Sequence, residues 1–136
     1  MKEADLRPVV TQFLEQRGME VHAEVPLNGR IADLVGLGDG LTAVELKLAD
    51  WRRGLRQAIC YQIACEESYL CFPFPRALRL LSKSHYLERE GIGLLGCLLD
   101  QNEVRVLFPA SPSPRWLPFM GEGVRRRLRR LGSPVA

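Results

Sequence analysis

Three charged residues lie in segments whose other residues are mostly apolar and predict β-strands. Asp33 interrupts the apolar run 31–37, and Glu45 and Lys47 lie two apart in the run 41–48, on one face of a strand. A buried carboxylate is costly unless it has a partner. Each residue alone could end a strand or face solvent, but a short antiparallel hairpin would bring Asp33 beside Glu45. We therefore expect a shared site.

Two carboxylates and a lysine are the groups that metal-assisted phosphodiester hydrolysis requires. Mg²⁺ takes oxygen ligands, which Asp33, Glu45 and the carbonyl of Leu46 could supply. A bound metal lowers the pKa of a coordinated water and offsets charge on phosphorus. Lys47 could orient that water, because its ammonium is compact and its pKa can be shifted.

The elements that must position these residues follow from periodicity and turn signals. The first three strands are closely joined, which indicates an antiparallel meander, and the class is mixed α/β. We expect helices at 4–16, 51–67, part of 76–90 and 124–131, strands at 19–25, 31–37, 41–48, 68–72, 92–99 and 103–108, and turns at 26–30 and 38–40.

Asp33 and Glu45-Leu46-Lys47, followed by an amphipathic helix, resemble the PD-(D/E)xK nuclease superfamily. Gln57 and Tyr61 match the QxxxY signature of its RecB-like branch, whose members include exonucleases. The resemblance covers residues 1–75 and extends more loosely through the strand that begins near 91–93. It implies a restriction-endonuclease-like core, a central mixed β-sheet flanked by helices in αβββαβ order, here with a C-terminal hairpin and helix.

The resemblance also implies roles. The chain would hydrolyse nucleic-acid phosphodiesters, with DNA as the expected substrate and Mg²⁺ or Mn²⁺ as cofactor. Asp33, Glu45 and the Leu46 carbonyl would hold the metal, Lys47 would act on the water, and Gln57 and Tyr61 would position the phosphate or that water. An acidic residue of the first helix often completes the site in this family. The choice among Glu3, Asp5 and, on the next strand, Glu24 stays open. Ala32 precedes Asp33 where the family pattern has Pro.

Charge is distributed unevenly along the chain. The formal net charge is +3, from 19 Lys and Arg against 16 Asp and Glu, but five arginines fall within 125–130 and leave a body of net −2. The basic segment is either a nucleic-acid contact, a solvated tail or a helix docked on the acidic body. The candidate contacts to nucleic acid are Arg30, Arg53, Arg56, Arg125, Arg126, Arg127, Arg129 and Arg130.

Composition restricts the class of protein. With 136 residues, 46% of them hydrophobic, we expect one domain, with a nuclease-like part at 1–108 and a Pro-rich connector and basic helix at 109–136. No apolar run approaches the ~18 residues of a membrane span, and the start of the chain has no signal-peptide pattern. Four cysteines without CxxC spacing predict reduced thiols in a cytoplasmic protein.

The sequence is compatible with two further hypotheses about function. The chain could be a nucleic-acid-binding or regulatory module that keeps the nuclease fold with little catalytic activity. It could also form a homodimer or join a larger complex as a subunit.

Overall fold

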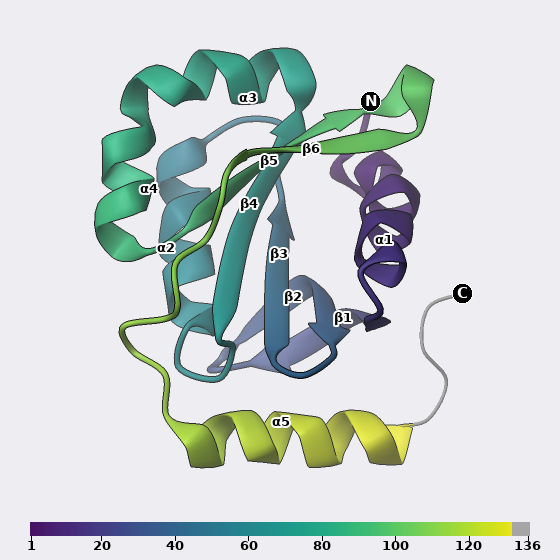
Figure 1. Cartoon of the computed structure of the whole chain (residues 1–136), viewed down its shortest axis with the longest axis vertical. Coiled ribbons are helices and arrows are strands. Elements are labelled where there is room, and N and C mark those ends of the chain that lie inside the picture. The colour runs from purple at the N-terminus through teal and green to yellow at the C-terminus, as the bar shows by residue number, and fades with distance from the viewer. Residues whose placement is uncertain (132–136) are drawn as a thin grey trace.

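The computed structural model describes residues 1–131 and contains one six-stranded mixed sheet with helices on both faces (Figure 1). The mixed α/β class predicted from the sequence is confirmed. The strands lie in chain order across the sheet, namely β1 (Glu20–Leu27), β2 (Arg30–Leu37), β3 (Leu41–Leu46), β4 (Glu67–Pro73), β5 (Gly93–Leu98) and β6 (Glu103–Phe108).

The first three strands form the predicted antiparallel meander. The turn predicted at 26–30 is shorter than expected, because β1 continues through Leu27 and pairs it with Arg30. Asn28 and Gly29 both have positive φ, 52° and 78°. This is the geometry of a two-residue hairpin turn, whose twist matches that of the flanking strands. Two residues are therefore enough to connect β1 and β2.

The next two connections are crossovers. β3, β4 and β5 pair in parallel, with α2 (Trp51–Tyr61) between the first two and α3 (Phe74–Leu80), a 3-10 turn (Leu81–Lys83) and α4 (Ser84–Glu90) between the last two. The helix predicted at 51–67 ends at Tyr61. The backbone N–H groups of Ala64 and Cys65 both donate to the Tyr61 carbonyl, which closes a turn without any glycine or proline to signal it.

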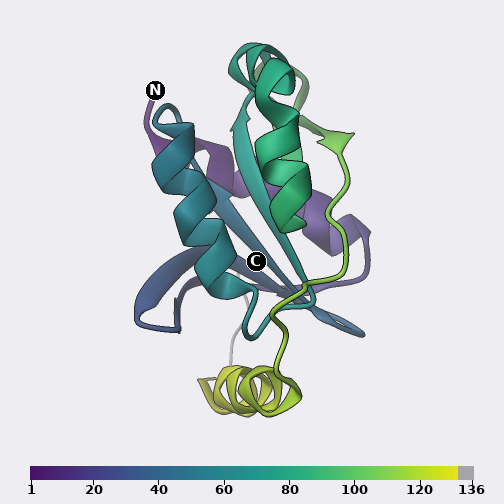
Figure 2. The same cartoon turned by 90° about the vertical axis from the view of Figure 1, so that its left-hand side faces the viewer.

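The two faces of the sheet pack against different helices (Figure 2). A 3-10 turn (Glu3–Leu6) leads into α1 (Arg7–Gln16), which packs on the face that carries Tyr69 and Cys71 of β4. Helices α2, α3 and α4 cover the opposite face, where Leu70 and Phe72 lie. β4 is therefore buried on both sides, which explains its continuous apolar sequence.

The cysteines behave as predicted. All four are free, and Cys65, Cys71 and Cys97 are buried. Burial raises the pKa of the Cys65 thiol to about 12 and that of Cys97 to about 11. These thiols are protonated near neutral pH and are poor nucleophiles.

The last helix, α5 (Pro118–Leu131), begins earlier than the predicted 124, since Pro118 suits a first helical turn. It lies across one end of the sheet, apart from the other helices (Figure 1), and buries Val124 and Leu128. None of the helices within residues 1–131 is long and apolar enough to cross a bilayer.

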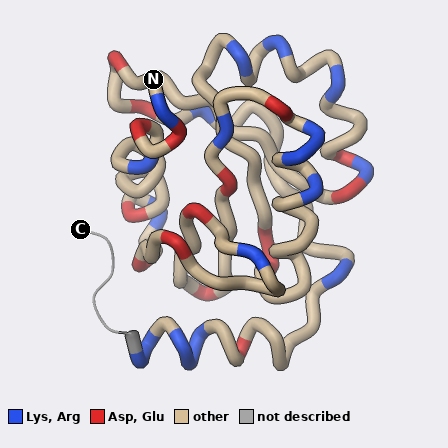
Figure 3. Tube along the Cα trace, turned by 180° about the vertical axis from the view of Figure 1, so that it is seen from behind, with Lys and Arg blue, Asp and Glu red and all other residues tan. Residues whose placement is uncertain are grey.

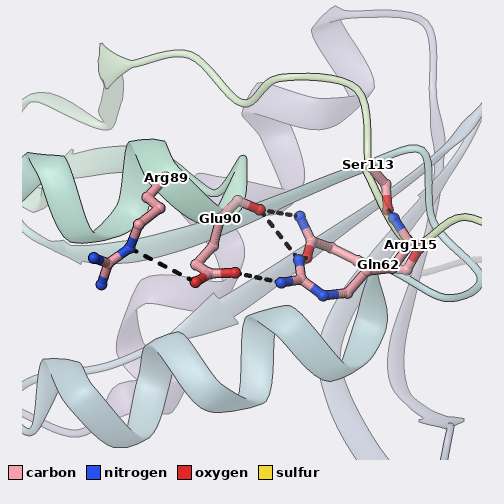
Figure 4. A network of polar contacts seen from close by, with 5 residues as sticks. All are labelled: Gln62, Arg89, Glu90, Ser113 and Arg115. Carbon is pink, nitrogen blue, oxygen red and sulfur yellow. Dashed lines mark hydrogen bonds and ion pairs between the residues drawn. The ribbon is translucent and has the colours of Figure 1, made fainter.

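The connector before α5 is fixed to the body by a polar network (Figure 4). Gln62 follows the end of α2 and is fully buried. Its side-chain amide donates to the Glu90 backbone carbonyl at 2.7 Å, and its backbone carbonyl accepts from the Ser113 hydroxyl at 2.7 Å. The Arg115 guanidinium donates to both Gln62 and the Glu90 carboxylate. These contacts hold the connector against the body shortly before α5 begins.

Candidate functional site

The backbone pairing between β2 and β3 ends just before Asp33, and we call this place the opening of the sheet. The last ladder pair between β2 and β3 is Leu34 with Val44, and the same register sets Asp33 opposite Glu45. There the Asp33 carboxylate, through Oδ2, accepts the Leu46 N–H at 2.7 Å in place of a backbone carbonyl. On the other side of β2, the register sets Glu24 opposite Asp33, but Glu24 has a φ of 54° and the pairing is interrupted. β2 thus separates from β3 at the first carboxylate, whereas its pairing with β1 is interrupted there and resumes at Ala32.

Glu45 and Lys47 point under α2 and not into solvent. Their residues are 3% and 8% exposed, so the solvent-facing interpretation of this pair is wrong. Lys47 Nζ lies 3.7 Å from Glu45 Oε2. Burial, together with the charge of Asp33, raises the pKa of the Glu45 carboxyl to about 7. Asp33 and Glu45 thus repel each other, and the Glu45 side chain is shielded from solvent.

Tyr61 contacts the site from α2. Its hydroxyl lies 2.7 Å from Glu45 Oε1 and 3.0 Å from the Ile31 carbonyl, and it has one proton to donate. When Glu45 is protonated, it can donate to the tyrosine oxygen and leave the tyrosine proton to Ile31. Burial and the Glu45 contact raise the pKa of Tyr61 above its usual value. The tyrosine is therefore a neutral hydrogen-bond partner of Glu45.

Gln57 lies one turn before Tyr61, and its Oε1 is buried with no hydrogen-bond partner among the described residues. A buried polar atom without a partner is costly, so such an atom in a site suggests a missing donor. Gly54 lies one further turn back. A Cβ at this position would meet Leu70 Cδ2 at 2.9 Å and Lys47 Cγ at 3.1 Å. The absent side chain is what lets the lysine stem lie against α2.

The donor set fits a hard divalent cation. Asp33 and Glu45 face each other, and a cation between them would remove their repulsion. The Lys47 N–H bonds to β4, through the Cys71 carbonyl, whereas the Leu46 N–H points to β2. Since the N–H and C=O of one strand residue point to the same edge, the Leu46 carbonyl also faces the opening at Asp33. The three predicted ligands therefore lie around one gap.

The three additional acidic candidates do not join this gap. Within residues 1–131 no three His, Cys, Asp or Glu side chains gather as a metal-binding group. Glu3 is exposed, and the Asp5 carboxylate accepts the Lys2 N–H at 2.8 Å. Glu24 has its side chain 68% exposed and pairs with Arg7 at 3.4 Å. The site in this structure is built from two carboxylates.

The predicted arginines divide into two groups. Arg30, Arg53 and Arg56 are exposed around the site, on β2 and α2. Of the five on α5, two are half-buried and bond to backbone carbonyls. Arg125 donates to Gly38 and Asp39 at 3.1 and 2.7 Å, and Arg127 donates to Pro26. The exposed basic positions of α5 are Arg126, Arg129 and Arg130. Figure 3 shows that the basic positions of α5 lie toward the C-terminal end of this helix.

A second basic cluster was not predicted. Arg76, Arg79 and Lys83 line a groove between α3 and the start of α2. Their spacing of three and four residues is the signal that could have revealed it, because it would place all three on one face of a continuous helix. In the structure, Arg76 and Arg79 lie on α3 and Lys83 lies on the 3-10 turn that follows it.

No protein-family model, curated protein or solved structure matches this chain. Functional inference therefore rests on the geometry of the site.

Proposed function

We propose that the chain is a metal-dependent nuclease that hydrolyses nucleic-acid phosphodiester bonds, with DNA as its expected substrate. The observation that carries the proposal is the buried constellation at the opening of the sheet. Asp33 and Glu45 stand opposite each other, and Lys47 Nζ lies 3.7 Å from Glu45. The order of helices and strands up to β4 supports a restriction-endonuclease-like core.

Each side chain has a distinct task in this proposal. Asp33, Glu45 and the Leu46 carbonyl hold Mg²⁺ or Mn²⁺, which supplies a water of lowered pKa and offsets charge on phosphorus. Lys47 donates to the attacking water and stabilises charge on the phosphate. Tyr61 fixes the orientation of the Glu45 carboxylate through its hydroxyl. Gln57, whose carbonyl oxygen has no partner in the described part of the chain, holds the water or a substrate donor.

Cleavage assays with single-stranded and duplex DNA and with RNA, in Mg²⁺ or Mn²⁺, test this function. Asp33→Asn keeps an oxygen for the Leu46 N–H but loses the charge, and Lys47→Met keeps the stem but loses the ammonium. We expect each variant to lose at least about 100-fold in rate, as when a group that stabilises the transition state is removed.

The matched control is Asp100→Asn, which removes an exposed carboxylate on the 3-10 turn between β5 and β6. This variant should cleave like the wild type. The proposal fails if the wild type cleaves none of the substrates with either cation, or if Asp33→Asn and Lys47→Met cleave at the wild-type rate.

One observation favours a second candidate, a nucleic-acid-binding or regulatory module with little catalysis. The part of the chain that the structure describes brings only two carboxylates together at the site. Binding of the same oligonucleotides without cleavage, unchanged in Asp33→Asn, would favour this module over the nuclease.

A further inference from the structure

A groove of about 170 Å³ lies beyond the candidate site, between the start of α2 and the helix α3. Ala49 and Asp50, which follow Lys47 along the chain, form one wall together with Trp51. The groove therefore adjoins the end of β3 where the site lysine stands. It lies on the sheet face that α2, α3 and α4 cover.

The opposite wall carries three cations without local compensation. Arg76, Arg79 and Lys83 are exposed, and within residues 1–131 none has a carboxylate oxygen within 4.0 Å. The one carboxylate in the lining, Asp50, accepts the backbone N–H of Arg53 at 3.3 Å as a helix cap. Like charges gathered on one face repel each other unless an anion compensates them.

Apart from Asp50, the rest of the groove is lined by apolar residues. Phe72 and Leu80 are buried in the core beneath it. The Trp51 ring packs against Tyr86, with centroids 5.5 Å apart, and the Arg52 guanidinium lies 4.7 Å from its centroid. With Tyr86 and Arg52 against its ring, Trp51 forms a wall of the groove more than a stacking surface for a base. The groove thus presents cations for a phosphate and not an open ring for a base.

We propose that this groove binds a backbone phosphate of a nucleic-acid strand that passes from the candidate site over the start of α2. The identification of the ligand as a polynucleotide rests on the proposed function. The phosphate chemistry itself rests on Arg76, Arg79 and Lys83. A free mononucleotide offers the same phosphate, so the test separates the two sources.

The test measures oligonucleotide binding by fluorescence anisotropy in EDTA, where metal-dependent cleavage is absent. Arg76→Gln/Arg79→Gln removes two cations from the groove. The matched control, Arg17→Gln/Arg105→Gln, removes two exposed arginines at the end of α1 and on β6, with the same change in net charge. Circular dichroism checks that both variants fold.

We expect the groove variant to bind about 10-fold more weakly or worse at low salt, with its dependence of log Kd on log salt reduced by roughly 1, for the one phosphate that the groove binds. The control should match the wild type. Equal affinity and equal salt dependence for the two variants would overturn the inference, and so would a wild type that binds no oligonucleotide. A nucleoside monophosphate that competes as well as the oligonucleotide would also overturn it, by indicating a mononucleotide site.

These results are separable from those of the cleavage assays. If the wild type cleaves and depends on Asp33 but the groove variant binds normally, the nuclease function stands and the groove inference falls. If the groove variant alone loses binding and no cleavage occurs, the groove stands and the nuclease function falls.

Discussion

Among single residues, Glu45 has neighbours that shift the pKa of its carboxyl group in opposite directions. Burial and the neighbouring Asp33 favour the protonated form, whereas the Tyr61 hydroxyl and the Lys47 ammonium favour the carboxylate. The first two dominate and raise the pKa from 4.5 to about 7. The folded protein therefore binds this proton more tightly than the unfolded chain. Stability from this group is fully present below pH 4.5 and is lost as the pH rises through 7.

Glu45→Gln should remove this pH dependence, because an amide does not ionise. In EDTA, we expect the wild type to lose up to about 3 kcal/mol of unfolding free energy between pH 4.5 and 7 through Glu45. The variant should lose correspondingly less. Urea unfolding of both proteins across this range gives the difference, in which the titrating groups that do not interact with Glu45 cancel.

The matched condition is the same titration with Mg²⁺ added. A cation that binds the Glu45 carboxylate should restore stability to the wild type at pH 8 and have a smaller effect on the variant. If the difference between wild type and variant is the same at pH 4.5 and at pH 8, the assignment of a raised pKa to Glu45 is wrong.

The sequence predicts the residues of the site better than their contacts. The antiparallel hairpin and the period of two place Asp33 opposite Glu45, and helical spacing places Gln57 and Tyr61 on one side of α2. The hydrogen bond from the Leu46 N–H to the Asp33 carboxylate depends on where the β2–β3 ladder ends. Strand pairing determines that point, and no local pattern marks it.

Among the elements, α2 controls the position of Lys47, since Gly54 lets the helix and the lysine stem approach closely. Glycine inside a helix is unfavourable by about 1 kcal/mol relative to alanine. Its presence in the first half of α2 is therefore explained by packing and not by helix formation.

Gly54→Ala should accordingly destabilise the protein even though alanine favours the helix. The added methyl meets Leu70 and Lys47, and we expect a net loss of about 1 to 2 kcal/mol from overpacking. The displaced lysine should also lower the cleavage rate. Thermal unfolding and the cleavage assay measure the two effects.

Gly123→Ala is the matched control, because it also lies inside a helix, α5, and a Cβ there meets nothing within 4 Å. It should stabilise the protein by up to about 1 kcal/mol. A Gly54→Ala variant that gains stability like the control would contradict the close packing of α2 on Lys47.

Element boundaries follow from tertiary contacts more than from local signals. β6 agrees with its prediction residue for residue, because a hairpin turn and alternating residues define it. The end of α2 and the start of α5 do not agree. The end of α2 depends on the turn that Ala64 and Cys65 close on the Tyr61 carbonyl. The connector before α5 is held by Gln62, whose backbone carbonyl accepts from Ser113 and whose side-chain oxygen accepts from Arg115. Sequence periodicity carries no information on a partner some fifty residues away.

At the scale of the whole molecule, the basic segment is a docked helix with an exposed basic side. Val124 and Leu128 are buried, and Arg125 bonds to the turn between β2 and β3. The net charge of +3 thus combines cations with a structural role and cations available to a partner. This matches one of the alternatives weighed from the sequence, a helix docked on the acidic body.

The half-buried and the exposed arginines of α5 should differ in their effect on stability. Arg125→Gln/Arg127→Gln removes charged hydrogen bonds to backbone carbonyls, so we expect a loss of about 2 kcal/mol of unfolding free energy. Arg126→Gln/Arg129→Gln changes exposed side chains and should alter stability by less than about 0.5 kcal/mol. Urea unfolding measures both, and the two variants serve as each other's control because their net charges are equal.

Nucleic-acid binding should show the opposite order. If α5 contacts the substrate, Arg126→Gln/Arg129→Gln reduces the salt dependence of log Kd by roughly 2, whereas Arg125→Gln/Arg127→Gln leaves it near that of the wild type. Anisotropy measurements below the unfolding transition give this comparison. Equal salt dependence in both variants and the wild type would assign α5 a purely structural role. In that case we expect the nucleic-acid contacts on the second basic surface, along α2 and α3, where Arg53, Arg56 and Arg79 are exposed.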